Sequence, residues 1–331
     1  FGSRLLKAQA RTYRSIDFAN LILSEFLAFG SLLMGVACSA DKQCCAAGDR
    51  NDQLLLGRIS AREDGTFSSS MYLSKEMQEL NTLKTNGTGM TNNKPHVFAT
   101  GSVYKGQWAK SMRHGYGKHT WPDGTCYEGQ WEENLASGSG RFTHKDGDIY
   151  IGQWDKSMAH GLGILYHNDG NMTYKGQWRY DLQHGYGVEL GTDRPAYQGA
   201  FCEGHKHGFG CYKWLDESTY EGSWSEDVLH GPGKWQANDG RAYSGQWSDS
   251  VMHGIGRYGW PGGRSYSGQY VLDSKEGFGT FTWPDNWPDG KKYEGYWVKD
   301  KPCGAGKQTM KDGSIKEAFW QDGQCITPAQ S

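Results

Sequence analysis

Histidine is the residue type in this sequence whose spacing most invites a chemical interpretation. Six of the eleven histidines are regularly spaced, 46 residues apart for the first two and 23 or 24 apart for the rest: His114, His160, His184, His207, His230 and His253. A shared metal needs ligands about 2 Å from the ion, whereas equivalent side chains two strands apart stand about 10 Å from each other. Ser137, Glu276 and Cys303 occupy the remaining places of the series. We therefore interpret the histidines as structural, with hydrogen bonds at a loop, and predict no metal site.

Glycine-rich strings offer a second possible chemistry, the binding of phosphate. Gly115-Tyr116-Gly117-Lys118 lacks the preceding glycine of a P-loop, and it does not join a strand to a helix. The sequence contains no GxSxG, HExxH or kinase signature. The paired carboxylates Glu132 and Glu133 are typical of a solvated surface loop. We predict that the protein is not an enzyme, with no catalytic residues and no cofactor.

The histidines belong to a longer repeat that organises two thirds of the chain. The string Tyr-x-Gly-x-aromatic recurs at intervals of 23, 23, 24, 23, 23, 23, 23 and 27 residues. A Gly-x-Gly unit begins eleven residues after each start. The nine starts are Tyr104, Tyr127, Tyr150, Tyr174, Tyr197, Tyr220, Tyr243, Tyr266 and Tyr293.

Each unit predicts a β-hairpin. Side chains alternate between the faces of a strand, so Tyr104, Gly106 and Trp108 share one face and the glycine leaves room for a neighbouring side chain. A loop then leads to His114 and to a second strand, residues 118–121. We expect Asp-Gly pairs such as Asp123-Gly124 to form two-residue hairpin turns, because these turns need positive φ.

These residues resemble the MORN repeat family (membrane occupation and recognition nexus), whose pattern is close to YxGxWxxGxxHGxGxxxxxDG. Nine copies run from Tyr104 to about Ile315, and a weak tenth start at Lys316 resembles a terminal cap. The resemblance implies a mostly β protein: an elongated, twisted single-layer antiparallel sheet of stacked hairpins with an aromatic-lined groove. It implies a ruler or platform rather than a globule.

Positions that vary between the copies are where a specific partner would be recognised. Four residues after the second glycine the side chain changes from copy to copy, and the copy that starts at Tyr266 carries four extra residues with a doubled Trp-Pro-Asp. Local packing or a tolerated insertion is the alternative. The predicted partner-facing residues are Trp121, Trp214, Trp260, Trp283 and Trp287.

Net charge bears on two other classes of partner. From residue 101 onward there are 24 basic and 28 acidic residues. This balance disfavours a polybasic lipid surface on the repeats and disfavours nucleic acid. Contact between the repeats and lipid stays open but is not favoured.

The first hundred residues have a different composition. All 14 tryptophans lie after residue 100, and we divide the chain into a basic segment (1–17), an apolar helix (18–38), an irregular region with a short helix at 74–83 (39–83), a polar linker (84–95), the repeat array (96–320) and a tail (321–331). The apolar segment Phe18–Cys38 has one charged residue, Glu25, and is long enough to span a bilayer. We therefore predict a transmembrane helix. A helix packed on partner subunits is the alternative. Cys38, Cys44 and Cys45 follow it as free thiols or as a disulfide.

These features lead to one leading hypothesis and two alternatives. The sequence starts at Phe1 rather than at methionine, as expected of a processed or an incomplete chain, and a removed organellar presequence is one explanation. Basic residues precede the apolar segment. We predict a membrane-tethered accessory subunit of a respiratory or photosynthetic complex, in the mitochondrial inner membrane or the thylakoid. The alternatives are a cytoskeletal or axonemal scaffold and a phospholipid-binding membrane-junction protein.

Overall fold

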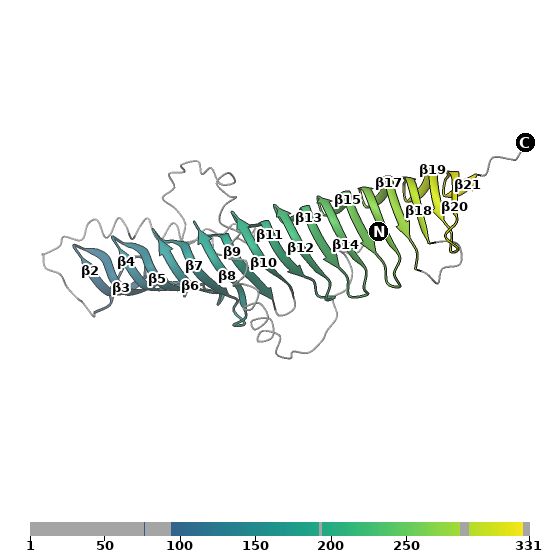
Figure 1. Ribbon diagram of the computed structural model, residues 1–331. Helices are drawn as coiled ribbons and strands as arrows, with labels where there is room; N and C mark the ends of the chain where they lie inside the picture. The colour runs from purple at the N-terminus through teal and green to yellow at the C-terminus, as the bar shows by residue number, and fades with distance from the viewer. Residues whose placement is uncertain (1–75, 77–93, 192–193, 285–290, 327–331) are drawn as a thin grey trace, which may run out of the picture. The chain divides into compact units, whose positions relative to one another are not determined.

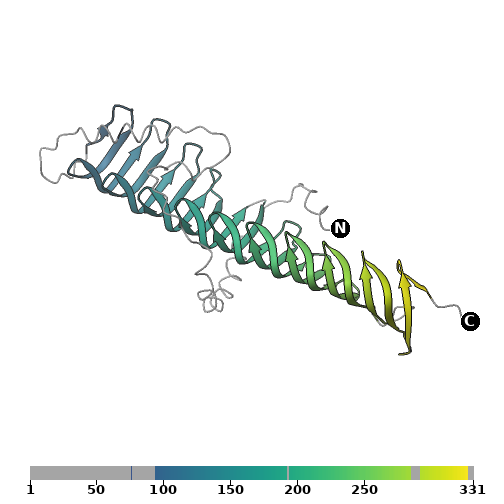
Figure 2. The same ribbon diagram turned by 90° about the horizontal axis from the view of Figure 1, so that it is seen from above.

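The computed structural model describes residue 76 and residues 94–191, 194–284 and 291–326, all within the unit of residues 54–331. In this part of the chain, 21 strands form one antiparallel sheet, in which each strand pairs with the strands before and after it in the sequence. Figures 1 and 2 show the strands following one another in a single twisted row. The prediction of a mostly β, single-layer antiparallel sheet is confirmed.

The strands of the sheet have the following bounds: β1 (His96–Val97), β2 (Val103–Ala109), β3 (Met112–Thr120), β4 (Cys126–Glu132), β5 (Leu135–Thr143), β6 (Ile149–Asp155), β7 (Met158–Tyr166), β8 (Met172–Arg179), β9 (Leu182–Gly191), β10 (Arg194–Cys202), β11 (His205–Lys213), β12 (Thr219–Ser225), β13 (Val228–Gln236), β14 (Ala242–Ser248), β15 (Val251–Gly259), β16 (Ser265–Val271), β17 (Ser274–Thr282), β18 (Lys292–Val298), β19 (Lys301–Thr309), β20 (Ile315–Gln321) and β21 (Gln324–Ile326).

Two kinds of turn alternate along the sheet, and their assignment corrects the predicted hairpin. The two-residue turn with positive φ at both positions is Lys110-Ser111, with φ of 50° and 66°. It directly joins β2 to β3, so His114 lies inside a strand rather than after a loop. The equivalent turns of the other repeats also follow the aromatic residue by two positions, because this turn type matches the twist of the strands it connects.

The Asp-Gly pairs lie in the longer turns at the other end of the hairpins. The backbone N–H of Trp121 donates to Thr125 (2.9 Å) and that of Gly124 donates back to Trp121 (3.0 Å). Gly124 has φ of 91°, whereas Asp123 is not in the positive region. This is a three-residue loop with a left-handed glycine, and the expectation of a two-residue Asp-Gly turn was wrong.

Glycine pairs and tyrosines make the core of each repeat. Gly106 pairs with Gly117 across the strands, and a Cβ on either glycine would overlap the ring or hydroxyl of Tyr104. The space beside the glycines is therefore filled by the tyrosine of the same strand, not by a side chain of the neighbouring strand. The Tyr104 hydroxyl donates to the carbonyl of Gln107 at 2.9 Å, and all nine repeat tyrosines make the equivalent bond.

The second aromatic residue links each repeat to the one before it. The Trp131 ring stands edge-on to Tyr127 of its own repeat (5.0 Å between centroids) and to Tyr104 of the preceding one (5.5 Å). Its Nε1–H donates to the carbonyl of Gly117 at 3.0 Å. T-shaped pairs of this kind continue to Trp320, so the core is one row of alternating rings.

The positive-φ turns also bind the preceding repeat. The side chain of Asn134 accepts a hydrogen bond from the backbone N–H of Arg113 (2.7 Å), and the Asn134 N–H donates to the Arg113 carbonyl (3.0 Å). Asp181 and Asp273 bind Ala159 and Met252 in the same way at 2.7 Å. The turn side chain thus completes the backbone hydrogen bonding of the neighbouring repeat.

Both ends of the array extend the repeat pattern. β1 pairs with β2 before the first repeat, and β20 and β21 form the closing hairpin after the ninth repeat. Trp283 and Lys291 close the enlarged turn of repeat eight, so the extra residues fall at that turn.

Several predictions lie outside the described residues, among them the segment Phe18–Cys38, the linker at 84–93 and Cys38, Cys44 and Cys45. Glu76, within the short helix expected at 74–83, has a helical backbone. No helix among the described residues has the length and apolar character needed to cross a bilayer.

Replacing Gly256 by alanine tests the packing of tyrosine on the glycine pair. We expect Gly256→Ala to lower the free energy of unfolding by about 1–3 kcal/mol, because the new methyl group would overlap Tyr243. Urea unfolding followed by circular dichroism measures this loss. Gly259→Ala, on the same strand with no atom within 4 Å of the added Cβ, is the matched control. An equal effect of both variants would contradict the packing account.

Alkaline pH tests the burial of the tyrosines. Burial raises the pKa of Tyr104, Tyr220 and Tyr293 to about 12, against about 10 in an unfolded chain. Because the unfolded chain loses these protons first, their contribution to stability is complete below about pH 10 and is lost as the pH rises through about 12. We expect the urea midpoint to fall steeply over that range, with tyrosinate absorbance appearing together with unfolding. Ionisation of these tyrosines without unfolding would refute this.

Candidate binding face

The sheet presents two chemically different faces. The inner face, as we call it, carries the repeat tyrosines and their aromatic partners, which are buried. The outer face carries the residues that alternate with them, such as Lys105 and Tyr116, which are exposed. The faces follow from strand alternation.

A second row of aromatic residues runs along the inner face beside the core. In the first two repeats three of its four members are buried: His119 is 0% exposed and Trp121 and Phe142 are each 4% exposed, whereas the fourth, His144, is only partly buried. In repeats five to eight the equivalent positions are only partly buried. These residues, which we call the open aromatic row, are Tyr212, Trp214, Trp235, Tyr258, Trp260, Phe281 and Trp283.

The predicted partner-facing tryptophans divide between these two situations. Trp121 packs between His119 (4.5 Å between centroids) and Phe142 (6.3 Å), so it has little surface for a partner. Trp214, Trp260 and Trp283 are half-buried members of the open aromatic row. Partner binding by these three stays a prediction, and Trp287 lies outside the described residues.

Glu76 lies at the buried end of the row, against His119. Its carboxylate lies on the inner face of the first repeat, where Oε2 is 3.4 Å from Arg113 Nη1 and 3.3 Å from His119 Nε2. Oε1 accepts hydrogen bonds from the hydroxyls of Ser102 and Thr100. The side chains of Glu76, Arg113 and His119 are fully buried, so a charged group from the upstream region is bound on the inner face.

The protonation states of this cluster follow from its contacts. Burial opposes ionisation of Glu76, but hydrogen bonding to His119 and Ser102 and the charge of Arg113 outweigh it and hold the Glu76 pKa below its usual value. Burial, reinforced by the charge of Arg113, lowers the pKa of His119. Neutral His119 accepts from Arg113 through Nδ1 at 3.0 Å, and its Nε2 lies 3.3 Å from Glu76 Oε2.

Aromatic rings complete the site around Arg113. Its guanidinium lies 4.6 Å from the centroid of Trp131 and 5.8 Å from that of Phe98, and Nη2 donates to the carbonyl of Asn134 at 3.3 Å. A cation held between rings and a carboxylate is a strong, directional arrangement when it is desolvated.

Sequence reasoning did not identify Glu76 and Arg113. Glu76 lies upstream of the repeats, so no repeat position or motif in the neighbouring sequence indicated a function for it. Arg113 carried a signal, because the same position is Ala136 and Ala159 in the next two repeats, and a cation at an apolar position needs a partner.

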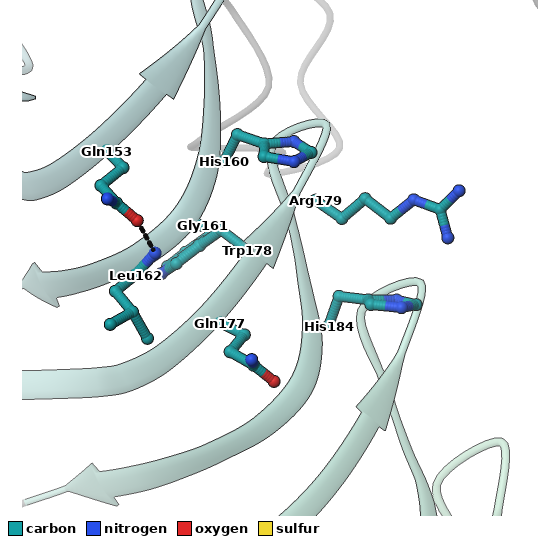
Figure 3. A pocket seen from close by; sticks show the side chains of 8 residues that line it. All are labelled: Gln153, His160, Gly161, Leu162, Gln177, Trp178, Arg179 and His184. Carbon is teal, nitrogen blue, oxygen red and sulfur yellow. Dashed lines mark hydrogen bonds between the residues drawn. The ribbon is translucent and has the colours of Figure 1, made fainter. Parts of the chain in front are cut away.

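The histidine series lies on the outer face, where glutamine makes the expected hydrogen bonds. Gln153 Oε1 accepts from the backbone N–H of Leu162 at 2.8 Å, the bond drawn in Figure 3. The Nδ1 atoms of His160 and His184 have no hydrogen-bond partner. The predicted loop hydrogen bonds of these two histidines are therefore wrong, and the role belongs to the glutamine that follows the repeat glycine.

His160 and His184 line an open cavity of about 420 Å³ together with Arg179 and Leu162. Figure 3 shows the two imidazoles on neighbouring repeats with the Arg179 side chain between them. Burial, together with the charge of Arg179, lowers the pKa of His184. Within the part of the chain that the structure describes, no group of three or more His, Cys, Asp or Glu side chains could hold a metal ion.

Exposed apolar residues recur along the rest of the outer face, and one of them, Phe278, pairs with the exposed ring of Tyr296 (5.6 Å between centroids). They occupy the middle of the Gly-x-Gly units and are 51–63% exposed: Tyr116, Leu162, Tyr186, Phe209, Ile255 and Phe278. Glycine on both sides leaves each of them isolated on its strand.

Comparison with known proteins identifies the repeat. The MORN repeat model matches residues 104–126, 127–149, 150–172, 174–194, 197–219, 220–240, 243–263, 266–287 and 293–315. The chain therefore belongs to the MORN repeat family, and the nine repeats predicted from the sequence are confirmed. Proteins of this family are generally non-catalytic interaction proteins. No curated protein matches the chain.

Among solved structures, the chain is similar to the G-box domain of the microcephaly protein CPAP, at 14% identity over 62% of this chain and 100% of that one, with a TM-score of 0.30. A second is the TCP domain of Drosophila melanogaster SAS-4 in complex with a proline-rich motif of Ana2, at 10% identity over 56% and 86%, with a TM-score of 0.29. A third is the Danio rerio CPAP TCP10 domain with a STIL peptide, at 13% identity over 69% and 99%, with a TM-score of 0.21. These TM-scores carry no argument about function.

Removing the Glu76 carboxylate tests the buried cluster. We expect Glu76→Ala to destabilise the first two repeats by about 3–5 kcal/mol, because Arg113 would remain charged and buried without its partner. Hydrogen exchange should accelerate in β2–β5 and stay unchanged in β14–β17, since repeats are coupled mainly to their neighbours. Glu128→Ala removes an exposed ion pair with Lys118 and should change little. Unchanged exchange in β2–β5 of the Glu76 variant would contradict the cluster's role.

Proposed function

We propose that this protein is a non-catalytic scaffold that binds segments of partner proteins on the inner face of repeats five to eight. The observation that carries the proposal is the contrast along one row of equivalent positions. These positions are buried in repeat one, where Glu76 lies on the sheet, and only partly buried in the open aromatic row.

The open aromatic row has the character of a protein-binding surface. Trp260, Phe281 and Trp283 are successive neighbours, with centroids 5.5 Å and 4.5 Å apart. Half-exposed aromatic side chains that are fixed by their neighbours offer a large contact area at a low entropic cost, and such residues are enriched at interaction hot spots.

The outer face is less suited to this role. In most repeats one apolar residue stands singly between glycines, and the exception is Phe278, whose ring centroid lies 5.6 Å from that of Tyr296. Scattered exposed apolar residues are normal on protein surfaces.

In the finer form of the proposal, the scaffold is an accessory subunit of a respiratory or photosynthetic complex and is tethered to the mitochondrial inner membrane or the thylakoid. The support is the apolar segment Phe18–Cys38 with basic residues before it. A cytoskeletal or axonemal scaffold without membrane insertion is the competing proposal, and lipid binding by the repeats is a third.

Native purification of the full chain tests both levels of the proposal. We expect the chain to stay in the membrane pellet after carbonate washing and to co-migrate with a large complex on native gels. Trp260→Ala should weaken partner binding about fivefold or more, because it removes an aromatic contact of about 1 kcal/mol or more. The matched outer-face variant Phe278→Ala should leave partner binding unchanged.

The alternatives predict different outcomes. Release into the carbonate supernatant with detergent-insoluble microtubule co-sedimentation would favour the cytoskeletal scaffold. Liposome binding that persists after deletion of residues 1–95 would favour lipid recognition by the repeats. Partner binding that depends on Phe278 but not on Trp260 would overturn the choice of the inner face.

A further inference from the structure

Repeat eight carries cations at the positions that bind a carboxylate in repeat one. In repeat one, Ser102 stands two residues before the repeat tyrosine and Arg113 nine residues after it, and both contact Glu76. Counted from Tyr266, the same two positions of repeat eight are Arg264 and Lys275. Because the repeats share one backbone register, these two side chains lie on the inner face.

Lys275 has the same aromatic surroundings as Arg113. Its ammonium lies 5.7 Å from the ring centroids of Trp260 and Tyr266 and 5.6 Å from that of Trp297. Its side chain is 15% exposed. Asp300 accepts one of its three N–H groups at 2.9 Å and is itself 51% exposed, so Lys275 can donate to a further carboxylate.

Further cations occupy one repeat position in this part of the array. Arg241, Arg264 and Lys291 each stand two residues before a repeat tyrosine, in repeats seven, eight and nine. The backbone N–H groups of Trp260 and Trp283 donate to the carbonyls of Arg264 and Lys291, both at 2.9 Å. The basic residues are thus cross-strand neighbours of the open aromatic row.

We infer that repeat eight binds a carboxylate of an acidic partner segment, held by Lys275 and Arg264 and flanked by apolar side chains on Trp260, Phe281 and Trp283. The chain itself contains an example of such carboxylate binding, because Glu76 is bound on the inner face of repeat one. The occupant is a partner protein segment in which Glu or Asp side chains alternate with large apolar ones. The inference rests on the proposed function and names the chemistry of its partner.

Two labelled 16-residue helical peptides test the inference, one with Glu and Leu along one face and one with Gln in place of every Glu. Fluorescence anisotropy with the full chain measures their affinity. We expect the Glu peptide to bind at least about fivefold more tightly than the Gln peptide and to weaken as salt is raised. Lys275→Gln and Arg264→Gln should each remove most of that preference. Arg257→Gln changes an exposed arginine of the outer face and should leave it intact.

The remaining outcomes separate the inference from the proposed function. Equal binding of both peptides, lost in Trp260→Ala, would overturn acidic recognition while supporting the inner face as a binding surface. A preference unaffected by Lys275→Gln would place the acidic site elsewhere and overturn the assignment. A concentration-dependent dimer that Lys275→Gln abolishes, measured by sedimentation, would assign the face to a second copy of the chain and overturn it too.

Discussion

The close approach of two glycines beneath one tyrosine is the constraint on which the rest of the structure depends. Gly245 and Gly256 pair across two strands, and the Tyr243 ring lies against both. This allows a single-layer sheet to bury a large side chain without a second layer of structure. Aromatic rings from the same repeat and from the next one pack edge-on against the tyrosine ring. The high glycine and aromatic content is therefore one structural device repeated nine times.

Coupling between repeats follows from the same geometry. Each tyrosine contacts the aromatic residue of its own repeat and of the next, and turn side chains such as Asp273 bind the backbone of the repeat before. Stability therefore passes between neighbours rather than through a central core. An inner face held in this way can carry different side chains in different repeats at little cost to the fold.

The sequence was sufficient for the repeat, the sheet and the burial of Tyr104 and Trp131, because a fixed interval and strand alternation determine them. It misassigned the turns: the Asp123-Gly124 pair favoured a two-residue turn, whereas the less conspicuous Lys110-Ser111 forms it. The buried cluster of Glu76, Arg113 and His119 could not be foreseen, since Glu76 comes from a region outside the repeats. Periodicity identifies what the copies share, and the binding chemistry lies where they differ.

The central claim is that the inner face of repeats five to eight, rather than the outer face, meets protein partners. Hydroxyl-radical footprinting of the purified complex tests it most directly, because adjacent residues of one strand report on opposite faces. Our account predicts that oxidation of Trp260, Phe281 and Trp283 falls in the complex relative to the isolated chain, while that of Ile255 and Phe278 is unchanged. Protection of Ile255 and Phe278 with no change at the three inner-face residues would contradict it.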